Sequence, residues 1–164
     1  MSTSADEGKA TSYTKIIRSR IMGNNPASAA LDPAIPYRFP AGLGVLIWGA
    51  DHTEISHCVV TDNATIGIAT MAFDKLGVRH LAADVARSGP PAEHTYAHHN
   101  LYANNGAAPA AEYVKEFAGI PAGDLYWDGL GERNQWQENV ELKTYPEKLV
   151  VKQGGVHTDV IHFQ

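Results

Sequence analysis

A short motif recurs along the chain, and it constrains the fold more than any other feature. Residues 14–24 (TKIIRSRIMGN) align without gaps with residues 53–63 (TEISHCVVTDN) and residues 95–105 (TYAHHNLYANN). A degenerate fourth copy, residues 133–139 (RNQWQEN), closes on an asparagine as the others do. Apolar alternation, β-branched residues and Asn or Gly at the breaks predict short strands in each copy.

The copies are unevenly spaced, which separates fixed structure from loops. The closing asparagines fall at positions 24, 63, 105 and 139. A second block precedes two of the copies, as GVLIWG at 44–49 and GDLYWD at 123–128. A constant motif at variable spacing predicts that the motif forms a fixed structural unit, or rung, and that the rungs are joined by loops. Three long loops are expected, at residues 26–41, 71–94 and 107–122. The composition of residues 110–117 favours a short helix within the third loop.

Short parallel strands stacked coil on coil form a solenoid, because each coil buries its inner face only against its neighbours. Stacked asparagine amides can hydrogen-bond along such a stack. The alignment predicts three inward columns and one asparagine ladder: Ile16, Ile55 and Ala97; Ile21, Val60, Tyr102 and Trp136; Leu46 and Leu125 with Trp48 and Trp127; and Asn24, Asn63, Asn105 and Asn139. We therefore expect an all-β right-handed parallel β-helix, a single-stranded solenoid of four coils with long loop insertions.

Length and composition are consistent with this fold. A chain of 164 residues predicts one structural domain, residues 12–149, between a flexible lead-in at 1–11 and a C-terminal cap or tail at 150–164. The charged fraction of 19% is low for a helical protein and ordinary for a turn-rich β protein. The net charge of −5 argues against nucleic-acid binding, and no apolar run reaches the length of a membrane span. The single cysteine, Cys58, excludes an internal disulfide and a multi-cysteine metal site.

Residues 44–68 resemble the closing coils of bacterial right-handed parallel β-helix proteins of the pectate-lyase-like superfamily. Residues 123–129, 133–139 and 144–146 extend the resemblance, since a Gly-Asn-x-Trp-x-x-Asn stretch often ends the solenoid in that group. Here Arg133 replaces the first glycine. The resemblance covers residues 12–149.

The resemblance implies carbohydrate activity and a periplasmic or extracellular location, although residues 1–11 lack the profile of a secretory signal. Lyases of that superfamily often use Arg or Lys together with Ca²⁺. Relatives usually have more coils before the matched segment. An open first coil exposes strand edges, so we expect a cover, for which a second copy in a homo-oligomer is one candidate.

A column of basic residues is the first candidate site. The alignment places four side chains at one position of successive copies: Arg18, His57, His99 and Arg133. A row of cations at rung spacing can bind an acidic polysaccharide, whose carboxylates also repeat along a line. The alternative is that this position favours any long polar residue beside a turn.

An acidic strand is the second candidate. If Leu125 and Trp127 point inward, then Asp124, Tyr126 and Asp128 share the outward face. Two carboxylates and a phenol can bind Ca²⁺ or transfer protons in uronate elimination. The alternative is a solvated polar face.

The histidines offer a third candidate, a Zn²⁺ or Cu²⁺ site at His57, His98 and His99. Alternation along a strand argues against it, because adjacent His98 and His99 would point to opposite faces. Cys58 is expected to be a small buried residue at a turn rather than a nucleophile.

Three functions follow from these candidates and stay open at this point. The first is a lyase or epimerase acting on an acidic polysaccharide. The second is a non-catalytic module that binds a glycan or a protein, and the third is a metal-binding periplasmic protein. Nucleotide and esterase functions have no support, since the chain contains no Gly-x-Gly-x-x-Gly, Walker or Gly-x-Ser-x-Gly motif.

Overall fold

The computed structural model describes the chain at residues 2–3, 12–25, 41–72, 91–109, 120–140 and 144–145. Within these ranges the chain is all-β and contains no helix, as expected for the fold class. Every strand pairing in them is parallel. None of the described segments forms a helix long and apolar enough to cross a membrane.

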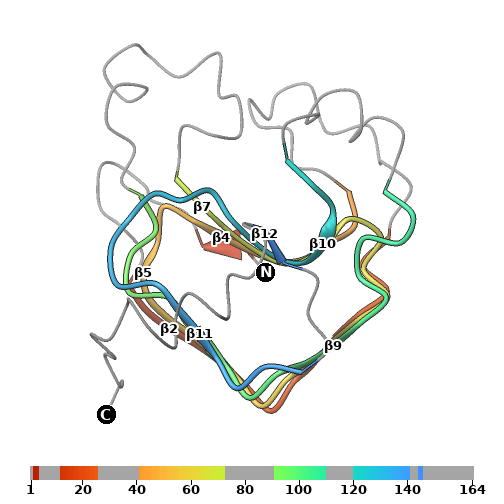
Figure 1. The fold of residues 1–164 in the computed structure, drawn as a ribbon. Helices are drawn as coiled ribbons and strands as arrows, with labels where there is room; N and C mark the ends of the chain where they lie inside the picture. The colour runs from red at the N-terminus through yellow and green to blue at the C-terminus, as the bar shows by residue number, and fades with distance from the viewer. Residues whose placement is uncertain are drawn as a thin grey trace.

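The strands belong to three sheets (Figure 1). The first sheet has the order β1 (Ser2–Thr3), β4 (Leu43–Trp48), β7 (Ile66–Met71), β10 (Gly123–Trp127) and β12 (Thr144–Tyr145). The second sheet has the order β11 (Gln135–Gln137), β8 (Tyr96–His98), β5 (Asp51–Ser56) and β2 (Ser12–Ile17). The third sheet has the order β3 (Arg20–Met22), β6 (Val59–Thr61) and β9 (Leu101–Ala103). The chain thus adds one strand to each sheet in a repeating order: β4, β5 and β6 belong to the first, second and third sheets, and so do β7, β8 and β9.

Left-handed backbone conformations recur at matching positions of successive copies. One such series follows the second-sheet strands: Arg18, His57, His99 and Glu138, with φ between 50° and 55°. These conformations are unfavourable for residues with a side chain, by about 1 kcal/mol or more. Here each is supported by rung pairing, since the His57 N–H donates to the His98 carbonyl at 3.3 Å and the Arg18 N–H donates to the Ser56 carbonyl at 3.0 Å. We name this series the corner column.

The main core lies between the sheets and confirms two of the predicted inward columns. Ile55, Val60, Ala97, Tyr102 and Trp136 are buried in one apolar cluster. The partly buried side chains of the first copy, Ile16 and Ile21, pack against it. One detail of the prediction is wrong, because Trp136 pairs with Ala97 and not with Tyr102.

The third predicted column is wrong by one residue. Leu125 pairs with Ile68, which pairs with Val45, so Leu46 aligns instead with Tyr126. A shift of one residue moves a side chain to the opposite face of a strand. Leu46 and Trp48 therefore lie in a second buried cluster with Tyr126, whereas Leu125 and Trp127 pack in the main core.

The asparagine ladder is confirmed over three copies. The Asn24 amide donates to Asn63 Oδ1 at 2.9 Å, and the Asn63 amide donates to Asn105 Oδ1 at 2.8 Å. The fourth place is taken by Asp124, whose Oδ1 accepts from Asn105 at 2.8 Å. Position 67 next to this ladder requires glycine, because a Cβ there would come within 3.1 Å of the amide carbon of Asn105 and within 2.6 Å of the carbonyl oxygen of Asp124.

The predicted fourth member, Asn139, belongs to a different ladder. Gln137 pairs with His98, so Asn139 aligns with Asn100 and accepts a hydrogen bond from its amide at 3.1 Å. The alignment of the fourth copy by its closing asparagine is therefore wrong, because the structure pairs Asn139 with Asn100 and not with Asn105. The Asn100 ladder continues to the Cys58 N–H, which donates to Asn100 Oδ1 at 2.9 Å.

The predicted division of the chain into a lead-in, one domain and a tail stays a prediction. Ser2–Thr3, inside the expected lead-in, pair with β4 as strand β1. The short helix at 110–117 and the tail at 150–164 lie outside the described residues. Among the described strands, β2 and β3 end their sheets and expose three large apolar side chains: Tyr13, Ile17 and Met22. The expectation of a cover by a second copy stays a prediction.

Replacing Asn105 with Ala is expected to reduce the free energy of unfolding by about 2–3 kcal/mol, because it leaves several buried polar groups without partners. The Asn105 amide donates to the Val60 carbonyl and to Asp124, and its oxygen accepts from Asn63. Urea unfolding followed by circular dichroism measures the change. Asn24→Ala is the control, since it removes the exposed end of the same ladder and should cost less than about 1 kcal/mol. Equal losses in the two variants would contradict this account of the ladder.

Candidate functional site

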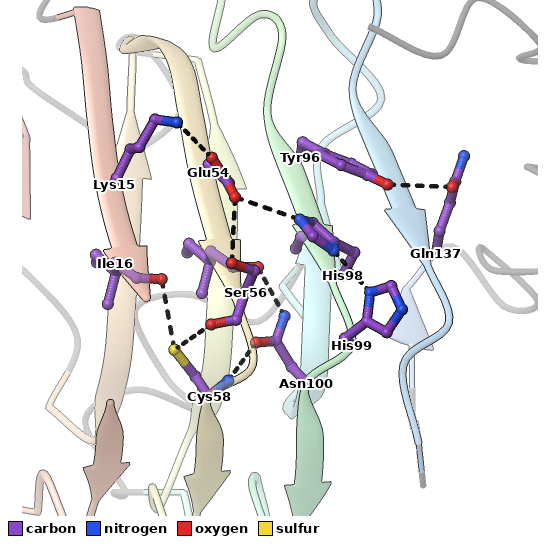
Figure 2. Close-up of polar contacts among 12 residues, drawn as sticks. Lys15, Ile16, Glu54, Ser56, Cys58, Tyr96, His98, His99, Asn100 and Gln137 are labelled. Carbon is purple, nitrogen blue, oxygen red and sulfur yellow. Dashed lines mark hydrogen bonds and ion pairs between the residues drawn. The ribbon is translucent and has the colours of Figure 1, made fainter. Parts of the chain in front are cut away.

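The outward side chains of the second sheet are joined by polar contacts (Figure 2). Several of them are shielded from solvent, since Ser56, Tyr96 and Gln135 are only 2%, 7% and 1% exposed. Because Ile55, Ala97 and Trp136 point into the core, their neighbours along each strand point outward. Strand pairing arranges these neighbours in two rows: Lys15, Glu54, Tyr96 and Gln135; and Ile17, Ser56, His98 and Gln137. We name these eight side chains the outer face. It draws one pair of residues from each of four strands.

Glu54 lies at the centre of this face and contacts three neighbours on three strands. Its Oε2 is 3.0 Å from Lys15 Nζ, and its Oε1 is 3.4 Å from His98 Nε2. The Ser56 hydroxyl donates to the same Oε1 at 3.2 Å. Burial on its own raises the pKa of Glu54, but the hydrogen bond and charge of Lys15, with the bonds from Ser56 and His98, outweigh it and hold that pKa below its ordinary value.

His98 connects Glu54 to the corner column. Its Nδ1 lies 2.7 Å from Nδ1 of His99, and the other nitrogen of His99, Nε2, contacts the Glu138 carboxylate. The Tyr96 ring stacks on the His98 ring with centroids 4.0 Å apart. The expectation that His98 and His99 point to opposite faces is wrong, because the left-handed backbone of His99 breaks the alternation of the strand.

The corner column keeps three of the four residues predicted for the basic row. Arg18, His57 and His99 are exposed at matching positions, and the His57 and His99 rings stack with centroids 5.0 Å apart and planes 4° apart. The fourth position holds Glu138.

Arg133 is a correction to the predicted row, because the displaced fourth copy puts it in another series. It aligns with His94, whose Nε2 lies 3.5 Å from Arg133 Nη1. The His94 ring stacks in turn on the His52 ring with centroids 4.3 Å apart. This second series lies at the start of the second-sheet strands, whereas the corner column follows their ends.

The predicted acidic residues do not form an open groove. Asp124 and Tyr126 are only 6% and 7% exposed, with Asp124 in the asparagine ladder and Tyr126 in the second apolar cluster. Asp128 is half-buried, and its carboxylate accepts from the Ala72 and Leu130 N–H groups at 2.7 and 2.9 Å. The contacts given for these residues are thus structural: hydrogen bonds within the fold for Asp124 and Asp128, and apolar packing for Tyr126.

The described residues include no group of three His, Cys, Asp or Glu side chains that could hold a metal ion. The proposed ligands His57, His98 and His99 are close together, but His57 meets His99 through ring faces rather than through nitrogen atoms. Cys58 is buried as expected, and its thiol contacts the Ile16 and Ser56 carbonyls at 3.5 and 3.3 Å. Burial raises the pKa of this thiol above its ordinary value, which does not favour a nucleophile.

Several residues of the outer face were not singled out from the sequence. They are Lys15, Glu54, Ser56, Tyr96 and Gln137. The signal was present in the aligned copies, because Lys15, Glu54 and Tyr96 occupy the second position of the motif. Alternation from the inward Ile16, Ile55 and Ala97 would have placed them on one outward row.

Comparison with known proteins gives no match. No family model fits the chain, and no curated protein or solved structure matches it. The resemblance to pectate-lyase-like proteins therefore stays a prediction from the sequence.

Replacing Glu54 with Gln should weaken the dependence of stability on acid pH. A carboxyl group whose pKa is lowered by folding stabilises the native state above its unfolded pKa, and that contribution is lost as the pH falls through the lower folded value. Wild-type protein should therefore lose stability below about pH 4.5, the ordinary glutamate value, partly through this group. Thermal unfolding across this range measures the slope, and the variant should show a shallower decline.

The matched control for this change is Glu132→Gln, which alters an exposed glutamate in the described part of the chain. Its stability should follow the wild-type pH profile. If Glu54→Gln and Glu132→Gln behave alike, the network around Glu54 does not contribute to acid stability.

Proposed function

We propose that the three parallel sheets are the faces of a right-handed parallel β-helix. The repeated order of the sheets along the chain supports this, because a chain that adds one strand to each of three sheets per copy winds into a coil. The hand follows from the strong preference of parallel crossovers for right-handed connections. The asparagine ladders and aligned left-handed corners support the same arrangement, since both recur once per copy.

The function that the geometry supports best is binding of an acidic polysaccharide along the exposed residues of the corner column, beside Lys15. The observation that carries the proposal is the exposed series Arg18, His57 and His99, which presents one cationic or protonatable side chain per rung. Lys15 lies beside it with its side chain 47% exposed. Carboxylates repeated along a polymer can pair with such a series. A polysaccharide ligand is consistent with a periplasmic or extracellular location.

Binding is favoured over catalysis by the contacts within the outer face. The nitrogen atoms of His98 face Glu54 and His99, and the Tyr96 hydroxyl donates to Gln137 at 3.3 Å. A general base needs a nitrogen or oxygen atom directed at the substrate proton. Of the residues predicted for acid–base chemistry, Asp124 and Tyr126 are buried, and the half-buried Asp128 carboxylate accepts from the Ala72 and Leu130 N–H groups. The proposal is therefore a non-catalytic glycan-binding module.

Replacing Arg18 with Gln should weaken binding to polygalacturonate or alginate roughly fivefold, because one charge-assisted contact per site is lost. Isothermal titration calorimetry at low salt measures the affinity, and added salt should weaken the wild-type interaction. Arg20→Gln is the matched control, since it removes an equally positive, exposed side chain from β3 in the third sheet. Equal affinity for both variants, or no binding by the wild type, would contradict the proposal.

A second measurement separates binding from elimination. Wild-type protein incubated with the same polymers, with and without Ca²⁺, should produce no increase in ultraviolet absorbance from unsaturated uronate. Accumulation of that product would show a lyase instead, and Tyr96→Phe would then test the phenol as the proton donor.

A further inference from the structure

Two adjacent imidazoles and two carboxylates form an unbroken chain of contacts that runs from the outer face to the corner column. The order is Glu54, His98, His99 and Glu138. Each Nε2 atom faces a carboxylate oxygen, that of His98 facing Glu54 and that of His99 facing Glu138. The two Nδ1 atoms face one another at 2.7 Å, and Figure 2 shows this contact together with the one between Glu54 and His98. The side chains of Glu54 and His98 are each only 13% exposed, so water competes weakly for this end of the chain.

The number of protons in this chain follows from its geometry. An ionised carboxylate only accepts hydrogen bonds, so both Nε2 atoms carry a proton. At 2.7 Å the two Nδ1 atoms need one proton between them, because two lone pairs would repel and two N–H groups would collide. The two rings thus hold three protons, one more than two neutral imidazoles hold.

We infer that His98 and His99 form a proton-binding site, in which one shared proton gives the pair a single positive charge between Glu54 and Glu138. We assign His98 as the neutral partner, because burial lowers its pKa below the ordinary value even though the hydrogen bond that its Nε2–H donates to Glu54 acts in the opposite direction. His99 then donates from Nδ1 to His98 and from Nε2 to Glu138.

The surroundings set the balance of this site. Glu54 and Glu138 favour the charged pair, while Lys15, hydrogen-bonded to Glu54, reduces the attraction of that carboxylate. The stacked His57 ring opposes a charge on His99 whenever His57 is itself protonated, and Arg18 is the next member of the same column. The Tyr96 ring covers His98 and excludes water. Loss of the proton leaves two facing lone pairs, so the exposed His99 ring is released from His98.

The inference is independent of the polysaccharide proposal, because it concerns the protein without ligand. Nitrogen NMR of protein labelled with ¹⁵N-histidine tests it. In mildly acidic buffer we expect a scalar coupling between the two Nδ1 atoms across the hydrogen bond, and a neutral Nε2–H tautomer for His98. The coupling should disappear as the pH is raised and the shared proton is lost. Absence of the coupling at every pH at which the protein is folded would overturn the inference.

Two variants test the partners of the pair. Glu138→Gln removes the carboxylate that faces His99, so the coupling should be lost at a lower pH than in the wild type. His57→Gln is the control in the same corner column, and it should keep the coupling, since it contributes no atom to the N–H···N contact. A Glu138→Gln profile identical to the wild type, or loss of the coupling in His57→Gln, would contradict the arrangement.

Discussion

The parallel rung-to-rung pairing between copies is the interaction on which the rest of this structure depends. It aligns residue with residue across three sheets, and it supports the left-handed corners that redirect the chain between them. An isolated histidine or arginine in this conformation is unfavourable. A corner whose N–H group donates to the next rung becomes part of a ladder, so the same unusual backbone recurs at the same place in each copy. Exposed side chains at those corners are aligned as a consequence.

Stacking of rungs also explains how so many polar groups are buried inside a chain of this size. Asn63, Asn100 and Asn105 are at most 5% exposed, and each uses its amide to bridge two neighbouring rungs. An asparagine amide buried without such partners would destabilise the native state by its full desolvation penalty. Asparagine suits the position because one side chain both donates and accepts along the stack. Asp124 can end one ladder because a terminal member needs only to accept.

The sequence could predict the parts of the fold that repeat without gaps. The first three copies align in the structure as their residues align in the sequence, which gives the inward columns at Ile55 and Val60 and the ladder through Asn63. The fourth copy and the first sheet could not be predicted in the same way. Asn139 could have been aligned with either Asn100 or Asn105, and the sequence alone does not choose between them. In the first sheet, two alignments of β10 that differ by one residue both match apolar residues with apolar residues, yet they place every side chain on opposite faces.

The outer face could have been predicted as a surface but not as a network. Alternation places Glu54 and His98 outward, yet the contact between His98 and His99 depends on a left-handed residue that interrupts the alternation. That corner brings adjacent side chains to the same side of the sheet and connects the partly buried Glu54 carboxylate to an exposed column. In the inferred proton-binding site, the charge of the column then depends on the proton shared between His98 and His99. Lys15 and Arg18 on this side of the sheet stand beside two carboxylates, Glu54 and Glu138, so any excess of positive charge there has to come from protonated histidines.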